Sequence, residues 1–99
     1  MRIRWTRPAA GDLTQICDYI EKHGSVAIAR RVALSIYQHV GTLAEFPERG
    51  RTGRRPDTRE LVFAGLPYLA VYRIGGGGVR SCEFCTVRKS GLKKRGLVQ

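Results

Sequence analysis

The chain has 99 residues, 42% of them hydrophobic, and its 18 basic and 8 acidic residues give a formal net charge of +10. This length fits one small domain and excludes an enzyme with separate cofactor and substrate domains. No apolar run approaches the ~20 residues of a membrane span, and the N-terminus lacks a secretion signal. The sequence therefore predicts a cytoplasmic protein without a membrane partner, and its strongly basic surface favours nucleic acid or an acidic protein as partner.

The predicted elements begin with a strand over residues 2–6, in which Ile3 and Trp5 alternate with polar residues. Pro8 then suits the first turn of a helix that stops near residue 23. Ser25 can cap a second helix, which is expected to end before Phe46 and the proline that follows it. Two helices joined by so short a connection form an antiparallel hairpin.

A loop rich in glycine, proline and arginine is predicted over residues 47–58, followed by strands over 59–64, 68–74 and 79–87. The predicted fold class is α+β, in the order β-α-α-β-β-β, with the helix hairpin packed on a small, mostly antiparallel sheet. Residues 1–88 form the predicted single domain, and residues 89–99 a basic, irregular tail. The expected core comprises Ile3, Trp5, Leu13, Ile16, Ile20, Val32, Ile36, Leu43, Phe46, Leu61, Val71 and Phe84.

Arginines are concentrated in and after the predicted loop, with tyrosines on the adjoining strand. Guanidinium groups match phosphates and carboxylates in shape and charge, and aromatic rings can stack on bases. A solvated charged loop is the alternative interpretation. The candidate target- or phosphate-binding residues are Arg51, Arg54, Arg55, Arg59, Tyr72 and Arg73.

Chemistry at a metal or a nucleophile finds little support in the sequence. Cys82 and Cys85 form a single Cys-x-x-Cys pair, whereas a zinc site needs three or four ligands. His23 and His39 have no ligand spacing, and no nucleophile accompanies either of them. The sequence therefore predicts no metal, no cofactor and no catalytic residue of its own.

Several separated motifs resemble those of the RelE/ParE superfamily of toxins from type II toxin–antitoxin pairs, in its ParE-like branch. The resemblance covers about residues 3–79 and lies in Trp5-Thr6-x-x-Ala9-x-x-Asp12-Leu13, Leu43-x-x-Phe46-Pro47-x-x-Gly50-Arg51-x-Gly53-Arg54, Thr58-Arg59-Glu60-Leu61-Val62 and Leu66-Pro67-Tyr68-x-x-x-Tyr72-Arg73.

The resemblance implies a small basic toxin that a cognate antitoxin neutralises, ParD-like or similar and with an acidic or amphipathic tail. That tail is expected to wrap the helix pair and the sheet. ParE-like members are associated with DNA gyrase, and RelE-like members with ribosome-dependent cleavage of messenger RNA. A decayed toxin that only binds its antitoxin is a third possibility. The candidate antitoxin-binding residues are Trp5, Leu13, Ile20, Ile36 and Tyr37.

The C-terminus departs from the family pattern. Residues 79–99 carry +5 of the net charge, and the usual ending, close to V-E-I-L-R-V-L-H-G-A-Q-x-W-P, is missing. Residues 79–92 can be encoded by codons that, read one base earlier, give E-I-L-R-V-L-H-G-A-Q-K-W-P. We interpret the ending as a frameshift from about residue 80; a divergent tail is the alternative.

A shifted frame would place Glu83 and Thr86 where the family has arginine and histidine, and small residues at Ser81, Cys82 and Cys85. The apolar pattern of residues 82–85 survives the shift, so the last strand is still expected to form. The loss of buried methylenes predicts a less stable fold with weak or no toxicity.

Overall fold

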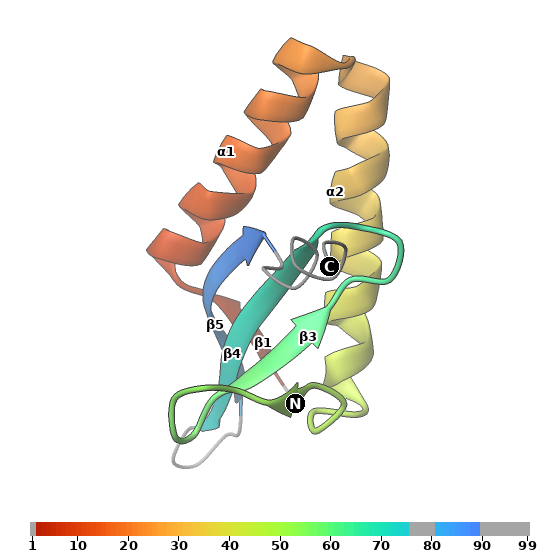
Figure 1. The fold of residues 1–99 in the computed structure, drawn as a ribbon. Coiled ribbons are helices and arrows are strands. Elements are labelled where there is room, and N and C mark those ends of the chain that lie inside the picture. Colours follow the sequence, from red (N-terminus) through yellow and green to blue (C-terminus); the bar gives the residue numbers. More distant parts are fainter. Residues whose placement is uncertain (1, 76–80, 90–99) are drawn as a thin grey trace, which may run out of the picture.

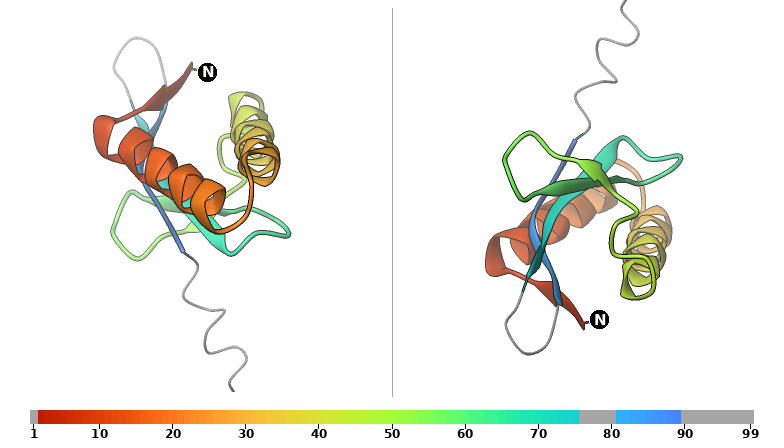
Figure 2. Two further views of the ribbon diagram at one scale, coloured as in Figure 1. Left: turned by 90° about the horizontal axis from the view of Figure 1, so that it is seen from above. Right: turned by 90° about the horizontal axis from the view of Figure 1, so that it is seen from below.

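The computed structural model describes residues 2–75 and 81–89 of the chain. These residues form a layer of two helices packed on one face of a five-stranded sheet (Figures 1 and 2). The predicted α+β class with a helix hairpin is therefore confirmed. The predicted irregular tail, from residue 90 onward, lies outside the described residues, as do residues 76–80 of the glycine-rich connection.

The hairpin consists of α1 (Arg7–His23) and α2 (Val26–Gly41). The side-chain oxygen of Thr6 caps α1 by accepting a first-turn amide at 3.3 Å. Ser25 caps α2 in the same way at 3.1 Å, as predicted from the sequence. In Figure 1 the two helices run side by side, and the turn between them lies well above the sheet.

The second helix ends earlier than predicted. It stops at Gly41 and passes into the short 3₁₀ helix η1 (Thr42–Ala44), which buries Leu43. Phe46 then lies beyond the helical segment and is 61% exposed, so its assignment to the core is wrong. The tighter turn of η1 changes the direction of the chain before Phe46 can follow the buried stripe of α2.

The sheet has the order β1-β5-β4-β3-β2, with β1 and β5 parallel and every other pair antiparallel. A two-residue strand, β2, lies within the segment that the sequence predicted as a loop. The last predicted strand is found as β5 and extends through Lys89, two residues past its predicted end and one past the predicted end of the domain. The strands are β1 (Arg2–Trp5), β2 (Arg51–Thr52), β3 (Arg59–Val62), β4 (Tyr68–Gly75) and β5 (Ser81–Lys89).

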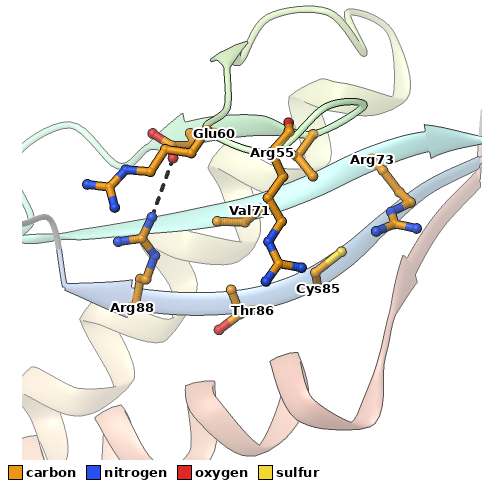
Figure 3. Close-up of a pocket in the computed structure, with 9 residues that line it drawn as sticks. Arg55, Glu60, Val71, Arg73, Cys85, Thr86 and Arg88 are labelled. Atoms are coloured by element: carbon orange, nitrogen blue, oxygen red, sulfur yellow. Dashed lines mark hydrogen bonds and ion pairs between the residues drawn. The ribbon is translucent and has the colours of Figure 1, made fainter.

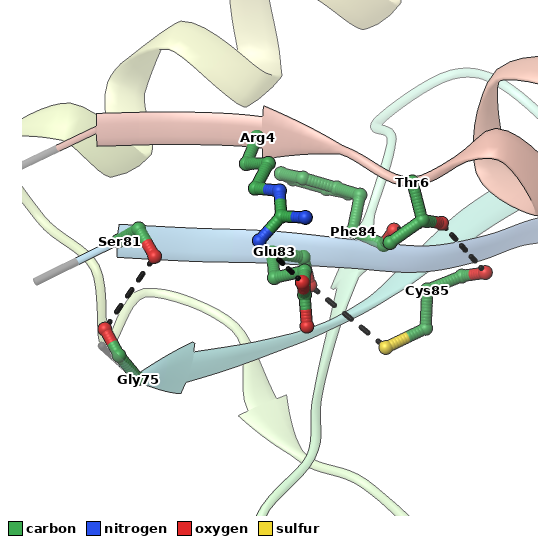
Figure 4. Close-up of polar contacts among 7 residues, drawn as sticks. All are labelled: Arg4, Thr6, Gly75, Ser81, Glu83, Phe84 and Cys85. Atoms are coloured by element: carbon green, nitrogen blue, oxygen red, sulfur yellow. Dashed lines mark hydrogen bonds and ion pairs between the residues drawn. The ribbon is translucent and has the colours of Figure 1, made fainter. Parts of the chain in front are cut away.

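Strand β5 lies inside the sheet, and several contacts from the N-terminal part of the chain fix it (Figure 4). The Thr6 hydroxyl donates to the Phe84 carbonyl at 2.6 Å, and Arg4 pairs with Glu83 at 3.1 Å. Past the end of β1, the Asp12 carboxylate accepts the Val87 amide at 3.0 Å. Asp12 thus satisfies a backbone donor on a strand edge that β1 leaves unpaired.

The core lies between the helices and the sheet. Phe84 is fully buried at its centre, stacked on Trp5 with ring centroids 5.0 Å apart and on Tyr72 at 5.4 Å. Val71 is only partly buried and lines a cavity with arginines, so its predicted core position is also wrong. The core cluster comprises Ala9, Leu13, Ile36, Val40, Leu43, Leu61, Phe63, Tyr68, Ala70, Tyr72, Cys82, Phe84 and Val87.

Candidate functional site

A cavity of about 380 Å³, which we call the arginine cavity, lies over β3, β4 and β5. Four arginines line it, two from the loop between β2 and β3 and two from the strands. Figure 3 shows Arg55 extending from that loop toward β5, where Cys85 and Thr86 lie. Its lining residues are Arg54, Arg55, Thr58, Glu60, Val71, Arg73, Cys85, Thr86 and Arg88.

A tight loop holds two of these arginines over the sheet. The Gly53 amide donates to the Thr58 carbonyl at 2.8 Å, and the Thr58 hydroxyl donates to the Arg55 carbonyl at 2.7 Å. Asp57 adopts a positive φ of 67°, a conformation that aspartate tolerates better than most residues. The backbone position of Arg54 and Arg55 is therefore fixed by the loop itself before any ligand binds.

Glu60 is the carboxylate of the cavity, and two arginines compensate its charge. Arg51 pairs with one oxygen at 2.9 Å, and Arg88 pairs with the other at 3.4 Å. The residue is only 7% exposed, so the two guanidinium groups offset the cost of burying its charge. Arg54, Arg55 and Arg73, by contrast, form no ion pair with any described residue, and their charge is available to a ligand.

The structure separates the predicted phosphate-binding residues into two groups. Arg54, Arg55 and Arg73 line the arginine cavity, together with Arg88, which is not among the residues predicted from the sequence. Arg59 donates to the Gly50 carbonyl at 2.8 Å and lines a neighbouring hollow of about 400 Å³. Arg88 reaches the cavity because β5 pairs with β4, a long-range contact that no local sequence pattern indicates.

Tyr72 does not belong to the site. It is fully buried on the helix side of β4, where its hydroxyl donates to the Pro47 carbonyl at 2.7 Å and accepts the Gly50 amide at 3.0 Å. A Cβ atom on Gly50 would lie 2.7 Å from that hydroxyl, which explains the glycine. The phenol ties the start of the arginine-rich segment to the core and has no surface for a partner.

The Tyr72→Phe variant is expected to lose about 1–3 kcal/mol of stability, because it leaves the buried Gly50 amide and the Pro47 carbonyl unpaired. Burial raises the pKa of Tyr72, and the Gly50 amide opposes that shift. Because this pKa is raised in the folded state, the stability that the neutral phenol contributes is fully present below the ordinary pKa of about 10. It is lost as the pH rises above that value. The melting temperatures of the unaltered chain and of the Tyr72→Phe variant should therefore converge between pH 7 and 11. A difference in melting temperature that stays constant over this range would contradict the prediction.

Two of the predicted antitoxin contacts are part of the core. Ile36 is fully buried and Leu13 is 7% exposed, because both point from the hairpin toward the sheet. Ile20 is partly buried near the end of α1. These side chains offer a partner little or no surface while the fold is intact.

A second surface, the exposed face of α2, carries large apolar side chains, among them the predicted antitoxin contact Tyr37. Leu34 is 56% exposed, and Tyr37, one turn later, is 53% exposed. The ring of Tyr37 meets the edge of the partly buried Trp5, with centroids 5.8 Å apart. Val26 and Arg30 precede Leu34 at four-residue intervals, so they lie on the same side of the helix. We call these five residues the α2 face.

The structure gives less support to other kinds of functional site. No group of three or more metal-ligating side chains occurs among residues 2–75 and 81–89. His39 Nδ1 donates to the Ser35 carbonyl at 2.8 Å, and His39 is not among the residues that line the cavity. Burial raises the pKa of the Cys17 thiol, with Asp18 and Glu21 adding to the shift, so the thiol stays protonated. No described helix is long and apolar enough to cross a membrane.

The chain matches the family described as ParE toxin of type II toxin-antitoxin system, parDE, over residues 3–82. It is 49% identical over 86 residues to Y4kP of Sinorhizobium fredii, which is named as a toxin; the match covers 87% of this chain and 84% of that protein. It is 41% identical to toxin RelE2 of Caulobacter vibrioides over 76 residues, which are 77% of this chain and 83% of that one.

Solved structures show the same architecture. A chain of the chromosomal ParDE system of P. aeruginosa superimposes with a TM-score of 0.80 at 25% identity, covering 90% of this chain and 95% of that one. A YoeB/ParE toxin from Agrobacterium tumefaciens gives a TM-score of 0.60 at 17% identity, covering 90% and 98%, and shares the fold. The chain belongs to the ParE toxin family of type II toxin–antitoxin systems.

Proposed function

We propose that this toxin acts in the cytoplasm by inhibiting DNA gyrase and that an antitoxin with an acidic or amphipathic tail neutralises it. The observation that carries the proposal is the match to the ParE family over residues 3–82, together with the similarity to a chain of a ParDE system along 90% of the sequence. Membership in a type II family implies a cognate antitoxin as partner.

The cavity supports a binding role rather than cleavage of RNA. General acid–base catalysis needs a group that can give up or take a proton within reach of the scissile bond. Among the described lining residues, Glu60 is the carboxylate, and Arg51 and Arg88 each hold one of its oxygens in an ion pair. Both histidines lie on the helices, outside the cavity lining.

Ribosome-dependent cleavage of messenger RNA is the second candidate function. Two observations favour it: a relative with 41% identity is named RelE2, and three uncompensated arginines line a cavity that suits phosphate. A decayed toxin that retains antitoxin binding alone is the third candidate, and the unusual C-terminus favours it.

Purified toxin added to gyrase and relaxed plasmid is expected to reduce supercoiling in proportion to its concentration. Premixing it with the cognate antitoxin is expected to restore supercoiling, which provides the control. The same preparation is expected to leave messenger RNA intact on translating ribosomes. Cut RNA with undisturbed supercoiling would establish the RelE-like activity instead, and inactivity in both assays with antitoxin binding retained would establish a decayed toxin.

A further inference from the structure

We propose that residues 45–49, which we call the Phe46 corner, bind a basic and apolar surface of DNA gyrase, with the ring of Phe46 as the central contact. This inference rests on the proposed function, because gyrase is the proposed target, and it adds the part of the toxin that meets the target. The exposure of Phe46, the rigidity of its backbone and the charge around it carry the inference.

Phe46 presents a large aromatic ring to solvent. It is 61% exposed, the highest fraction among the exposed large hydrophobic residues that the structure describes. A hollow of about 500 Å³, lined by residues 45–49, adjoins the ring and can admit a side chain of a partner. Contact of so much apolar surface with water is unfavourable, and aromatic residues are enriched at the centres of protein interfaces. The corner therefore has the form of an anchor for another protein.

The backbone on both sides of the ring is fixed by local hydrogen bonds. The Phe46 amide donates to the Thr42 carbonyl at 3.0 Å, and the Phe46 carbonyl accepts the Arg49 amide at 3.1 Å. The second bond closes a β-turn, and Pro47 occupies the turn position in which the fixed φ of proline is favoured.

The corner is also tied to the sheet. The Pro47 carbonyl accepts the Tyr72 hydroxyl at 2.7 Å, and the Glu48 carbonyl accepts the Arg59 guanidinium at 3.2 Å. Because the backbone is already ordered, binding through the Phe46 ring requires little additional loss of conformational entropy. A larger part of the free energy of burying the ring is then available for affinity.

The charge of the corner differs from that of the chain as a whole. Glu45 and Glu48 flank the ring and form no ion pair with any described residue. With Arg49, the lining of the hollow has two acidic residues and one basic residue, a net charge of −1 in a chain of +10. A lysine or arginine of a partner can pair with these carboxylates while it packs on the Phe46 ring.

This chemistry selects gyrase over the antitoxin. An enzyme that binds DNA presents basic surface to the phosphates. Such a surface repels the basic faces of the toxin, whereas the Phe46 corner complements it. The acidic tail proposed for the antitoxin has the opposite preference, because it complements Arg30 of the α2 face and is repelled by Glu45 and Glu48.

The test measures the inhibition of supercoiling by the purified full-length chain and its affinity for immobilised gyrase. The Phe46→Ala variant is expected to need at least a tenfold higher concentration for half-inhibition and to bind gyrase at least tenfold more weakly. Its affinity for the antitoxin should stay within threefold of that of the unaltered chain. Its melting temperature should stay within about 4 °C, because the ring is exposed.

The matched control is Ile28→Ala, which also truncates an exposed apolar side chain. Ile28 is 46% exposed in the first turns of α2, near the hairpin turn in Figure 1 and about 20 Å along the axis from the end of that helix at Gly41. It is expected to inhibit gyrase within twofold of the unaltered chain.

A second pair of variants tests the charge. The double variant Glu45→Gln, Glu48→Gln is expected to bind gyrase at least threefold more weakly at low salt, with a smaller loss at high salt. The control double variant Asp18→Asn, Glu21→Gln removes the same charge from exposed positions of α1 and is expected to bind within twofold of the unaltered chain.

Three outcomes would overturn the inference alone: undiminished inhibition by Phe46→Ala, an equal loss in Ile28→Ala, or a parallel loss of antitoxin affinity in Phe46→Ala. The third would assign the corner to the antitoxin interface. An unaltered chain that leaves supercoiling undisturbed would instead overturn the proposed function, and the inference with it.

Discussion

Exchanging Leu34 and Tyr37 for aspartate is expected to weaken antitoxin binding at least 100-fold, or about 2.7 kcal/mol. Both side chains are more than half exposed on α2 and belong, with Trp5, to the α2 face, where apolar surface is open to a partner. Large aromatic and aliphatic residues at such positions dominate the energy of protein interfaces. Two carboxylates would remain unpaired if an antitoxin segment covered them.

Calorimetry with the antitoxin encoded beside the toxin measures the effect. The control double variant, Ala10→Asp and Thr14→Asp, adds the same charge at exposed positions of α1 and is expected to bind within threefold of the unaltered chain. Its aspartates lie in the first half of α1, nearer the end of a helix that favours negative charge. Undiminished binding by the α2 variant would locate the antitoxin elsewhere on the toxin.

Ile36 shows why the sequence, which named Trp5 and Tyr37 as antitoxin contacts, located this surface only in part. A helix with apolar residues on more than one side gives no indication of which side meets the sheet. Leu34, Ile36 and Tyr37 are close together in α2, yet Ile36 is fully buried and the other two are exposed. A substitution at Ile36 would act on the stability of the fold rather than on a contact with the antitoxin.

The elements with strong local signals were predicted well. Ser25 was correctly identified as the cap of α2, and strands β3, β4 and β5 were located by their apolar pattern. The parallel pairing of β1 with β5 joins residues almost 80 positions apart, and no local pattern encodes it. The two residues of β2 are too few for a period of two to be visible.

The candidate site was predicted in part for the same reason. A cluster of arginines in the sequence identified Arg54, Arg55 and Arg73, which the structure brings together. Arg88 reaches the same cavity only because β5 pairs with β4. The burial of Tyr72 depends on the loop around Gly50 folding over its hydroxyl, which is a tertiary contact.

The unusual ending packs better than a shifted frame suggested. Cys82 is fully buried where the alternative reading has leucine, so the core loses apolar volume at this position, as expected. Phe84 and Val87 are also buried, and there the alternative reading has the smaller residues valine and glycine. The backbone contacts of β5 to Thr6 and Asp12 include the carbonyl of Phe84 and the amide of Val87. Gains and losses of apolar volume nearly cancel, so the structure gives no reason to expect a large deficit in stability.

Replacing residues 80–92 by E-I-L-R-V-L-H-G-A-Q-K-W-P is therefore expected to change the free energy of unfolding by less than about 2 kcal/mol. The change in toxicity should be much larger. Thr86 lines the arginine cavity, and Thr86→His would place a larger ring with two hydrogen-bonding nitrogens on that binding surface. Arg88→Ala would at the same time free one oxygen of Glu60 from its ion pair.

We expect the restored chain to arrest growth, without antitoxin, at expression levels at which the present chain does not. Growth curves over a range of inducer and thermal unfolding of both proteins measure the two effects. The single variant Thr86→His in the present chain isolates the contribution of the cavity, because it leaves Phe84 and Val87 in place. Equal toxicity of the present and restored chains would show that the ending is a functional variant, and codons incompatible with the alternative reading would exclude a shifted frame.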